Sequence, residues 1–388
     1  RRIQMKEIRI GMIGQGIIAQ SHLQEYAQMD GVKVVAVCDI LQDKLQASAQ
    51  KYGVEHTYVD YREMLQRDDL DAVDVCLHNN LHAPITCDVM LSGLDCYCEK
   101  PMAGSYRDAK AMYDLAQQLE CKLHIQLASL YKPNTRAARK LIDAGRLGHI
   151  YHARSTGYRR RGRPFVDGYA EKEFNSMHMA GGGALYDMGV YHIAQLLYLL
   201  DNPRPLRVSG RTYQEIPMDE RRRAESGFDV DELGVGLAYF ADGLTMDIIE
   251  AWAIHAPPFG SSVIAGSLGG VCLEPFSYYF SDADLTLTAT ADLNADEYRN
   301  HQLIPETAFY DNSQKHWIAA LRGQVPLLNT AEIALNTMFL SEGIFLSGKL
   351  GREVTADEIE ALSESNALTE QDTPFGTIVY KPWPFYSI

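Results

Sequence analysis

A glycine-rich turn near the start of the chain has the residue types of an anion-binding site. An apolar run at residues 8–13 leads into this turn and then into a stretch that favours a helix. The turn and its first helical residues are Gly14, Gln15, Gly16, Ile17, Ile18 and Ala19. Gly14 permits a tight turn, Gly16 lets the backbone approach a pyrophosphate, and the first N–H groups of a helix lack partners within it. We therefore expect residues 14–18 to bind a phosphate-bearing ligand.

An acidic residue stands at the matching place after the next expected strand. That strand covers residues 32–38 and ends at Asp39, twenty residues beyond Ala19. A carboxylate here accepts hydrogen bonds from the ribose hydroxyls of NAD and repels the 2′-phosphate of NADP. A glycine turn alone is a weak signal, because such turns join strands to helices in many proteins. The turn, its strand and the acid together favour an NAD site over a purely structural turn.

Two later strand ends carry polar side chains that could act on a substrate. The segment His78–His82 follows an expected strand at residues 71–77, and Glu99-Lys100-Pro101 follows another. Ligands of doubly wound sheets bind beyond the carboxyl ends of the strands. Lys100 could there donate a hydrogen bond to a substrate oxygen and help tune its proton loss. The alternatives are a solvated lysine paired with the preceding glutamate and, for His82, an ordinary residue at a helix N-terminus.

A second group of candidate residues follows a run of glycines. Gly181–Gly183 precede an expected helix that contains Asp187, Tyr191 and His192. Asp187 and Tyr191 are four residues apart and share a helical face, whereas His192 is turned by about 100° from Tyr191. An aspartate with a tyrosine or histidine one turn later could orient a substrate hydroxyl and exchange its proton. The alternative is a capping aspartate followed by aromatic residues at the edge of the core.

An arginine cluster stands out in a chain whose formal net charge is −15. If the expected strand alternates to its end, Arg159, Arg161 and Arg163 share one face. With the neighbouring Tyr158 they could contact a carboxylate, sulfonate or phosphate on a sugar. A solvated edge strand or a subunit contact is the alternative reading, and it is slightly favoured. Trp252 could stack on a sugar ring, or it could be an ordinary core tryptophan.

The elements that must position these residues fall into two groups. From Ile8 to about Leu127, short strands alternate with helical segments, which predicts a parallel, doubly wound sheet. Beyond Pro133, one helix precedes a run of longer strands, which predicts a mostly antiparallel sheet. These strands are expected at residues 150–161, 206–215, 233–240, 244–255, 261–266 and 270–276. Helices are expected at residues 84–92, 105–119, 135–144, 312–321 and 330–347, and a loop at 218–231.

We therefore predict an α/β protein of two domains. Residues 5–127 would form the nucleotide-binding domain with the doubly wound sheet. Residues 128–388 would form a substrate-binding and oligomerisation domain with an open, mostly antiparallel sheet.

Composition and charge exclude several classes of function. With 388 residues, of which 46% are hydrophobic, the chain can bury sizeable cores. Its acidic balance argues against nucleic-acid or anionic-membrane binding, which need a basic surface. No apolar run approaches the roughly 18 residues of a membrane span, and we expect no signal peptide before the first strand. The seven cysteines lack paired CxxC spacing, so we expect free thiols, no metal site and a cytoplasmic protein.

The order of these motifs resembles the glucose–fructose oxidoreductase and inositol dehydrogenase family, often called Gfo/Idh/MocA. The matching motifs, spread from residue 8 to about 350, are the glycine turn, Asp39, Glu99-Lys100-Pro101, Gly145-Arg146-Leu147-Gly148 and Gly181–Gly189. The resemblance implies an N-terminal Rossmann domain and a C-terminal α/β domain that carries the substrate cleft. It also implies a homo-oligomer, a dimer or tetramer, and hydride exchange between a nicotinamide and a sugar or cyclitol carbon.

The resemblance also implies roles for individual residues. The family's lysine corresponds to Lys100 and its helix aspartate to Asp187. Many members carry a histidine four residues after that aspartate, where this chain has Tyr191, although some relatives place tyrosine there. We therefore expect Tyr191 to be the acid/base, with His192 as the competitor. The cofactor contacts that the resemblance implies are Asn80, His82, Glu99 and Lys100.

The leading hypothesis is an NAD-dependent oxidoreductase acting on a sugar, sugar derivative or cyclitol, neutral or anionic. The alternative is an NAD-dependent glycosidase, in which transient oxidation lets a glycosidic bond break by elimination. A third possibility is a cofactor-binding regulator without activity. The joint presence of Lys100 and Asp187 disfavours the regulator, because a sensor has no need for both.

Overall fold

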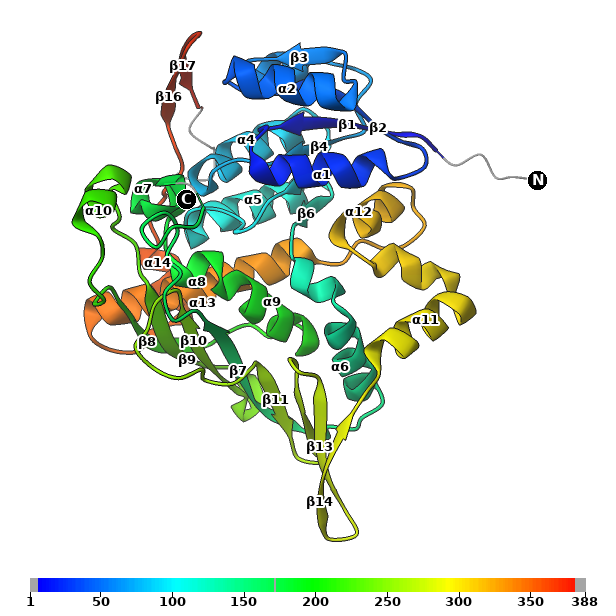
Figure 1. The fold of residues 1–388 in the computed structure, drawn as a ribbon, viewed down its shortest axis with the longest axis vertical. Helices are drawn as coiled ribbons and strands as arrows, with labels where there is room; N and C mark the ends of the chain where they lie inside the picture. The colour runs from blue at the N-terminus through cyan, green and yellow to red at the C-terminus, as the bar shows by residue number, and fades with distance from the viewer. Residues whose placement is uncertain (1–5, 171, 381–388) are drawn as a thin grey trace.

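The computed structural model describes residues 6–170 and 172–380, and Figure 1 shows the path of the chain. Its main features are a parallel six-stranded sheet and a nine-stranded sheet, with a separate two-stranded ribbon near the C-terminus. Met5 and residues 381–388, the outer limits of the two predicted domains, lie outside the described residues.

The first sheet is parallel throughout and has the strand order β3-β2-β1-β4-β5-β6. Its strands are β1 (Ile8–Ile13), β2 (Val32–Cys38), β3 (His56–Tyr58), β4 (Ala72–Val75), β5 (Asp95–Cys98) and β6 (Leu123–Ile125). The helices between them are α1 (Ile17–Ala27), α2 (Gln42–Tyr52), α3 (Tyr61–Met64), α4 (Asn79–Leu91) and α5 (Tyr106–Leu119). The central strands are buried on both faces because helices cover both sides, as their continuous apolar runs require. This confirms the doubly wound prediction.

The second sheet is mixed and mostly antiparallel, as predicted, and only the pair β7–β10 is parallel. Its strands are β7 (Ile150–Tyr158), β8 (Arg207–Tyr213), β9 (Leu233–Tyr239), β10 (Thr245–Ala251), β11 (Val263–Gly266), β12 (Gly269–Cys272), β13 (Ser277–Asp282), β14 (Leu285–Thr290) and β15 (Val354–Thr355). The strand order is β14-β13-β12-β11-β7-β10-β9-β8-β15, and the ribbon is β16 (Glu370–Thr373) with β17 (Gly376–Val379).

The helices of the second half include one long helix buried between the two sheets. The α-helices are α6 (Pro133–Asp143), α7 (Met177–Ala180), α8 (Ala184–Asp187), α9 (Gly189–Leu199), α10 (Glu220–Ser226), α11 (Leu293–Leu303), α12 (Ser313–Leu321), α13 (Thr330–Leu350) and α14 (Ala356–Leu362). Short 3₁₀ turns are η1 (Ala128–Tyr131), η2 (Lys172–Asn175), η3 (Ala241–Gly243) and η4 (Pro305–Tyr310). Helix α13 contacts β8 and β9 on one side and α5 and β6 on the other, so it joins the two sheets (Figure 1).

Helix α12 returns from the second half of the sequence to complete the first core. Trp317 is fully buried there and stacks on the ring of His124 at 5.7 Å. Ser313, at the start of α12, accepts a hydrogen bond from the Tyr97 hydroxyl at 2.9 Å. The two halves therefore share hydrophobic and polar contacts rather than meeting at a simple linker.

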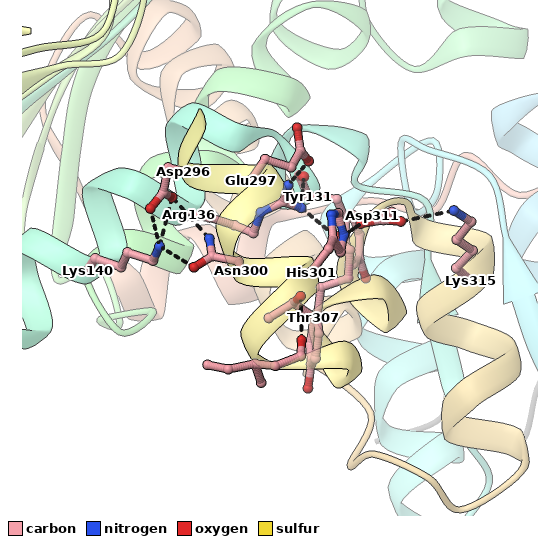
Figure 2. A network of polar contacts seen from close by, with 12 residues as sticks. Tyr131, Arg136, Lys140, Asp296, Glu297, Asn300, His301, Thr307, Asp311 and Lys315 are labelled. Atoms are coloured by element: carbon pink, nitrogen blue, oxygen red, sulfur yellow. Dashed lines mark hydrogen bonds and ion pairs between the residues drawn. The ribbon is translucent and has the colours of Figure 1, made fainter. Parts of the chain in front are cut away.

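Helix α11 has no buried residue and is held mainly by charged contacts, which Figure 2 shows. Lys140 on α6 donates to Asp296 at 2.7 Å and to Asn300 at 3.1 Å. Arg136, also on α6, pairs with Glu297 and donates to the carbonyl oxygens of Tyr131 and Tyr310. The network therefore fixes α11 and η4 to α6 and to η1.

The C-terminal segment crosses the start of α4 at a defined point. Pro84 lies inside α4, and because proline has no N–H, the carbonyl of Asn80 loses its usual helical donor. The backbone N–H of Leu368 donates to that carbonyl at 2.9 Å. A contact nearly 290 residues away in sequence thus satisfies the group that the proline leaves unpaired.

Four expectations about the elements are corrected by the structure. The segment His78–His82 is predicted as a turn, but His78 is the N-cap of α4 and the residues after it form the first turn of that helix. The predicted loop at 218–231 contains α10, whose first turn is capped by Asp219. Strand β7 ends at Tyr158, so the alternation expected to reach Arg161 stops before the arginines. Strands β3, β13, β14, β15, β16 and β17 are additions to the predicted set.

Candidate active site

The glycine turn has the geometry that a bound pyrophosphate needs. Gly14 has φ +88°, and a Cβ there would lie 2.1 Å from the Cys76 carbonyl oxygen, so the turn tolerates only glycine. A Cβ on Gly16 would meet nothing within 4 Å, which leaves open space beside the turn. Helix α1 begins at Ile17 without a side-chain cap, and this residue is 72% exposed. The N–H groups of the first turn, at Ile17 and Ile18, therefore lie at an accessible helix terminus.

Asp39 is anchored directly beside this turn. Its Oδ2 accepts a hydrogen bond from the Gln15 N–H at 2.7 Å, and its Oδ1 accepts one from the Leu41 N–H at 2.7 Å. A carboxylate has about four lone-pair positions, so two remain for another donor. The donor set, the open space at Gly16 and the uncapped helix together fit an adenine dinucleotide.

Lys100 and Asp187 meet across the boundary between the two halves. Lys100 follows β5, Asp187 ends α8, and their Nζ and Oδ1 atoms are 2.9 Å apart. The Lys100 ammonium also lies 4.8 Å from the centre of the Tyr191 ring. The structure thus brings together three of the four predicted catalytic residues.

The protonation states of this group follow from burial and pairing. Burial opposes the charge of Lys100, but Asp187 and then Tyr191 and Glu99 outweigh it and raise the pKa of the ammonium. Burial likewise opposes the charge of Asp187, yet Lys100 keeps the pKa of that carboxyl low, and Arg159 adds to the effect. Burial raises the pKa of the Tyr191 phenol although Lys100 pulls it down. Near neutral pH the site therefore holds an ammonium, a carboxylate and a protonated phenol.

His192, the fourth predicted catalytic residue, has a partner that the sequence reasoning missed. Its Nδ1 lies 3.0 and 3.2 Å from the two oxygens of Glu250 on β10. Glu250 is fully buried, whereas the His192 side chain is 30% exposed. A signal was present in the sequence: Met246, Ile248 and Glu250 occupy alternate positions, so the glutamate falls on the buried face of an apolar strand.

The residues around His82 serve the fold rather than an open cofactor surface. His82 is fully buried, with Nδ1 at 2.8 Å from the Pro101 carbonyl and Nε2 at 3.1 Å from that of Leu77. This corrects the expected nicotinamide contact for His82. The Asn80 amide donates to the His178 carbonyl at 3.0 Å, so it links α4 to α7 of the second half.

A buried cluster of charged residues lies beside Lys100 and supplies the hydrogen-bond partners of Glu99. His22 bridges Asp74 and Glu99 at 2.9 and 3.0 Å, and Tyr26 donates to Asp74 at 2.8 Å. Glu99 also accepts from the backbone N–H of the next residue at 3.0 Å, so it supports the catalytic segment from within the core. This position corrects the prediction that Glu99 contacts the cofactor directly. Cys76 completes the cluster with a thiol whose pKa burial raises, which disfavours metal binding by His22, Asp74 and Cys76.

The arginine cluster is largely neutralised by neighbouring acids. Arg163 is fully buried and pairs with Asp167 at 2.9 Å and Glu232 at 2.8 Å, while Arg161 pairs with the same Asp167 at 3.1 Å. These ion pairs favour the alternative reading, in which Arg161 and Arg163 pair with acidic residues, over contact with an anionic substrate. Arg159 remains a candidate substrate contact, because it lies close enough to Asp187 to lower its pKa.

The structure also corrects the predicted substrate contacts of two aromatic residues, Trp252 and Tyr158. Trp252 is fully buried among apolar residues, so it cannot stack on a sugar, although its indole helps to keep the pKa of Asp187 low. Tyr158 donates to the Ala256 carbonyl at 2.7 Å and lies on the face of β7 opposite Gly157, which faces His192. Tyr158 therefore points away from the candidate site.

Comparison with known proteins agrees with this geometry. Residues 8–127 match the family model "Oxidoreductase family, NAD-binding Rossmann fold", and residues 135–272 match the "GFO/IDH/MocA C-terminal domain". The chain belongs to the Gfo/Idh/MocA oxidoreductase family. The Gfo/Idh/MocA relatives include D-glucoside 3-dehydrogenase of Escherichia coli, 31% identical over 355 residues that cover 89% of this chain and 97% of the relative.

More distant Gfo/Idh/MocA proteins span similar lengths. D-Apiose dehydrogenase of Paraburkholderia graminis is 23% identical over 94% of this chain and 93% of its own. A solved structure of levoglucosan dehydrogenase with NADH and levoglucosan shares the fold, with a TM-score of 0.75 at 20% identity, over 90% of this chain and 99% of that one. Residues 8–127 thus form an NAD-binding Rossmann domain, and the protein is an NAD-dependent oxidoreductase. Among the described residues, no helix combines the length and apolarity needed to cross a membrane.

Proposed function

We propose that this protein oxidises a secondary hydroxyl of a neutral sugar or glycoside, using NAD. The observation that carries the proposal is the 2.9 Å pair between Lys100 and Asp187 beside Tyr191, at the carboxyl edge of the Rossmann sheet. A positive charge held there can stabilise the oxygen of a hydroxyl as it becomes a carbonyl. Asp187 holds the ammonium in place and keeps it charged.

The cofactor residues divide between pyrophosphate and ribose. We assign the pyrophosphate to Gly14, Gly16 and the N–H groups of Ile17 and Ile18, and the adenosine ribose to Asp39. When bound, NAD supplies the hydride acceptor.

Asp39 provides the test of the cofactor assignment. We expect Asp39→Ala to weaken NAD binding at least tenfold, because hydrogen bonds to a charged group contribute about 1.5–3 kcal/mol each. Calorimetric titration with NAD and NADP measures this, with Asp43→Ala, an exposed carboxylate on α2, as the control. Equal NAD affinity before and after the Asp39 change would contradict the role.

The arginine contacts and the glucoside-oxidising relative favour a neutral substrate. With Arg161 and Arg163 already paired, Arg159 is the cation of the cluster that we place near the reacting group. Incubation with NAD and a panel of neutral and anionic glycosides tests this by following NADH. Net NADH with neutral glycosides is the expected result. Free sugar without net NADH would indicate the redox-assisted glycosidase, and NADH only with anionic sugars would overturn the neutral assignment.

We also propose that the nine-stranded sheet forms a homodimer contact. Helices α8, α9 and α13 pack on one face (Figure 1), while Val235, Tyr239 and Ile249 lie partly exposed on the other. This face also carries Arg154, Asp247, Arg207 and Arg211, and a sheet face of exposed apolar and charged residues favours association with a second copy. A monomer by analytical ultracentrifugation would contradict this proposal, and Val235→Asp should dissociate the dimer.

We also propose a cytoplasmic location. The seven free cysteines support it, because free thiols persist in a reducing compartment.

A further inference from the structure

Glu250 is an ionisable residue in a place where a carboxylate is costly. It stands on β10 with no exposed surface, between Ile248 and Trp252, which are also fully buried. Burying a carboxylate is unfavourable unless it is paired and hydrogen-bonded. Glu250 has two such partners: the Ser155 hydroxyl at 2.8 Å and His192 Nδ1 at 3.0 Å.

Two glycines leave the space that this pair occupies. A Cβ on Gly157 of β7 would lie 2.0 Å from Glu250 Oε2 and 2.9 Å from His192 Cε1. A Cβ on Gly189, at the start of α9, would lie 3.2 Å from Glu250 Cγ. The strand and the helix that flank the pair are therefore shaped around it, which a surface ion pair would not require.

The contact with Glu250 decides which nitrogen of His192 is available. Because Nδ1 faces a carboxylate, it carries a hydrogen, and the opposite nitrogen, Nε2, is left for another partner. No hydrogen bond joins Nε2 to any described residue. A carboxylate–imidazole pair with one free nitrogen is the arrangement of an acid–base group whose tautomer and orientation are fixed.

The other polar groups of the site are poorly suited to exchanging a proton near neutral pH. Lys100 is locked as an ammonium by Asp187, and the Tyr191 phenol holds its proton because burial raises its pKa. For His192, burial lowers the pKa but Glu250 outweighs it and raises the value above 6.5. The other charges that face the imidazole are Lys132, which lowers this pKa, and Glu274, which raises it.

We propose that His192, oriented through Nδ1 by Glu250, exchanges the proton of the reacting hydroxyl at Nε2, while Lys100 and Tyr191 only stabilise the oxygen. The proposal rests on the proposed function. As the alcohol becomes a carbonyl, the hydroxyl proton moves to Nε2 and the hydride leaves carbon with its electron pair to the nicotinamide. The imidazolium then releases its proton to solvent. Glu250 is a positioning residue, since it acts through His192.

The decisive variant is Glu250→Gln, which keeps size and an accepting oxygen but removes the charge. In wild type, kcat/KM for oxidation should decrease as the pH falls below the pKa of His192, because only the neutral imidazole accepts a proton. This decrease is the acidic limb of the pH profile. Losing the carboxylate should move this acidic limb to lower pH by about one unit or more. His192→Asn should lose about 100-fold or more in kcat and abolish the limb, whereas Tyr191→Phe should retain it.

Three outcomes would overturn the proposal. One is a Glu250→Gln enzyme with lower rate but an unmoved limb, which indicates a purely structural role. Another is loss of the limb in Tyr191→Phe. The third is a Glu274→Gln control, in which an exposed neighbouring carboxylate is neutralised, that moves the limb as far as Glu250→Gln does.

A readout without turnover separates this proposal from the proposed function. Titration of ¹³C-labelled histidine rings by NMR, with the His192→Asn spectrum for assignment, gives the pKa of His192 directly. A lower pKa in Glu250→Gln supports the positioning role even if no sugar yields NADH, and an unchanged pKa overturns it. Failure of the wild-type enzyme to reduce NAD with any glycoside would count against the proposed function alone. Circular dichroism confirms that each variant is folded.

Discussion

Lys100 shows how one side chain can depend on contacts from several parts of the sequence. Its ammonium contacts Asp187 and faces Tyr191, while Glu99 accepts from its backbone N–H. His22 holds Glu99 in turn, so a fully buried residue on α1 sets the position of the catalytic segment. At this scale, the chemistry is controlled by charge pairs in a poorly hydrated environment, where each pair is stronger than it would be in water.

Lys100→Met should keep NAD binding and lose turnover. Methionine preserves the length of the side chain but removes the charge that stabilises the reacting oxygen, so kcat should fall about 10²–10⁴-fold. Steady-state kinetics and NADH fluorescence titration measure the two effects separately. Lys110→Met, at the half-exposed lysine that pairs with Asp114, is the control. Unchanged turnover would remove Lys100 from the mechanism.

His22→Gln should destabilise the protein in a pH-dependent way. Burial lowers the pKa of His22, but Cys76 and Asp74 outweigh it, so the folded-state pKa is well above 6.5. The charge of His22 thus stabilises the fold fully below pH 6.5, and this contribution is lost as pH rises through the folded-state pKa. The stability difference between wild type and His22→Gln should therefore shrink between pH 6 and pH 9.

Urea unfolding across this range provides the measurement. His124→Gln is the matched control, because burial lowers the pKa of that histidine and it is neutral throughout the upper part of the range. Its stability difference should stay constant above pH 7. A His22→Gln penalty that does not change with pH would show that the buried histidine is uncharged.

At the scale of elements, much of the candidate site follows from rules about strand ends and turns. The glycine turn, Asp39 and Lys100 lie at the carboxyl edge of a parallel sheet, as predicted. The single helix expected to carry Asp187 and Tyr191 is divided into α8 and α9, yet both residues still lie beside Lys100. Some of the errors have a common cause, which is contact with distant residues. Pro84 indicated a helix start, yet the helix begins earlier because Leu368 satisfies the carbonyl that the proline leaves unpaired.

The substrate residues were harder to predict for the same reason. Whether an arginine is available depends on acids elsewhere in the chain, and Glu232 directly precedes β9 whereas the arginines follow β7. Glu250 was the opposite case, since its place on the buried face of an alternating strand was readable in the sequence.

Arg136→Met should loosen α11 and disturb the site through η1. The change removes the pair with Glu297 and leaves the carbonyls of Tyr131 and Tyr310 without their donor, which should cost about 1–3 kcal/mol. Because Ser129 of η1 donates to the Tyr191 carbonyl at 2.6 Å, kcat should fall severalfold as well. Urea unfolding and kinetics test both effects. Arg299→Met, exposed on α11, should change neither by a comparable amount.

At the scale of the whole molecule, the two halves are joined at several separate places. Helix α12 completes the first core, α13 lies between the sheets, and the C-terminal segment reaches back to α4 (Figure 1). The candidate site lies between these three regions of contact. Its geometry therefore depends on how the halves are held, in addition to the fold of each.

Leu368→Pro should reveal how much the C-terminal segment contributes. The change removes the N–H that donates to the Asn80 carbonyl, so it should destabilise the protein by about 1–3 kcal/mol. In a Pro84→Ala background the helix can supply its own donor to that carbonyl, and the penalty should be smaller. A double-mutant cycle measured by thermal unfolding tests this coupling. Equal penalties in both backgrounds would show that the two residues act independently.

Lys100 and Asp187 come from different parts of the fold, one after β5 and the other at the end of α8, and this has a consequence for how the activity could arise or be lost. A fragment carrying only residues 8–127 would retain every feature assigned to the nucleotide, yet its ammonium would face water with no counterion. Turnover therefore depends on how the two parts pack together, and a displacement of about 1 Å between them could lower it about 100-fold while leaving dinucleotide affinity intact.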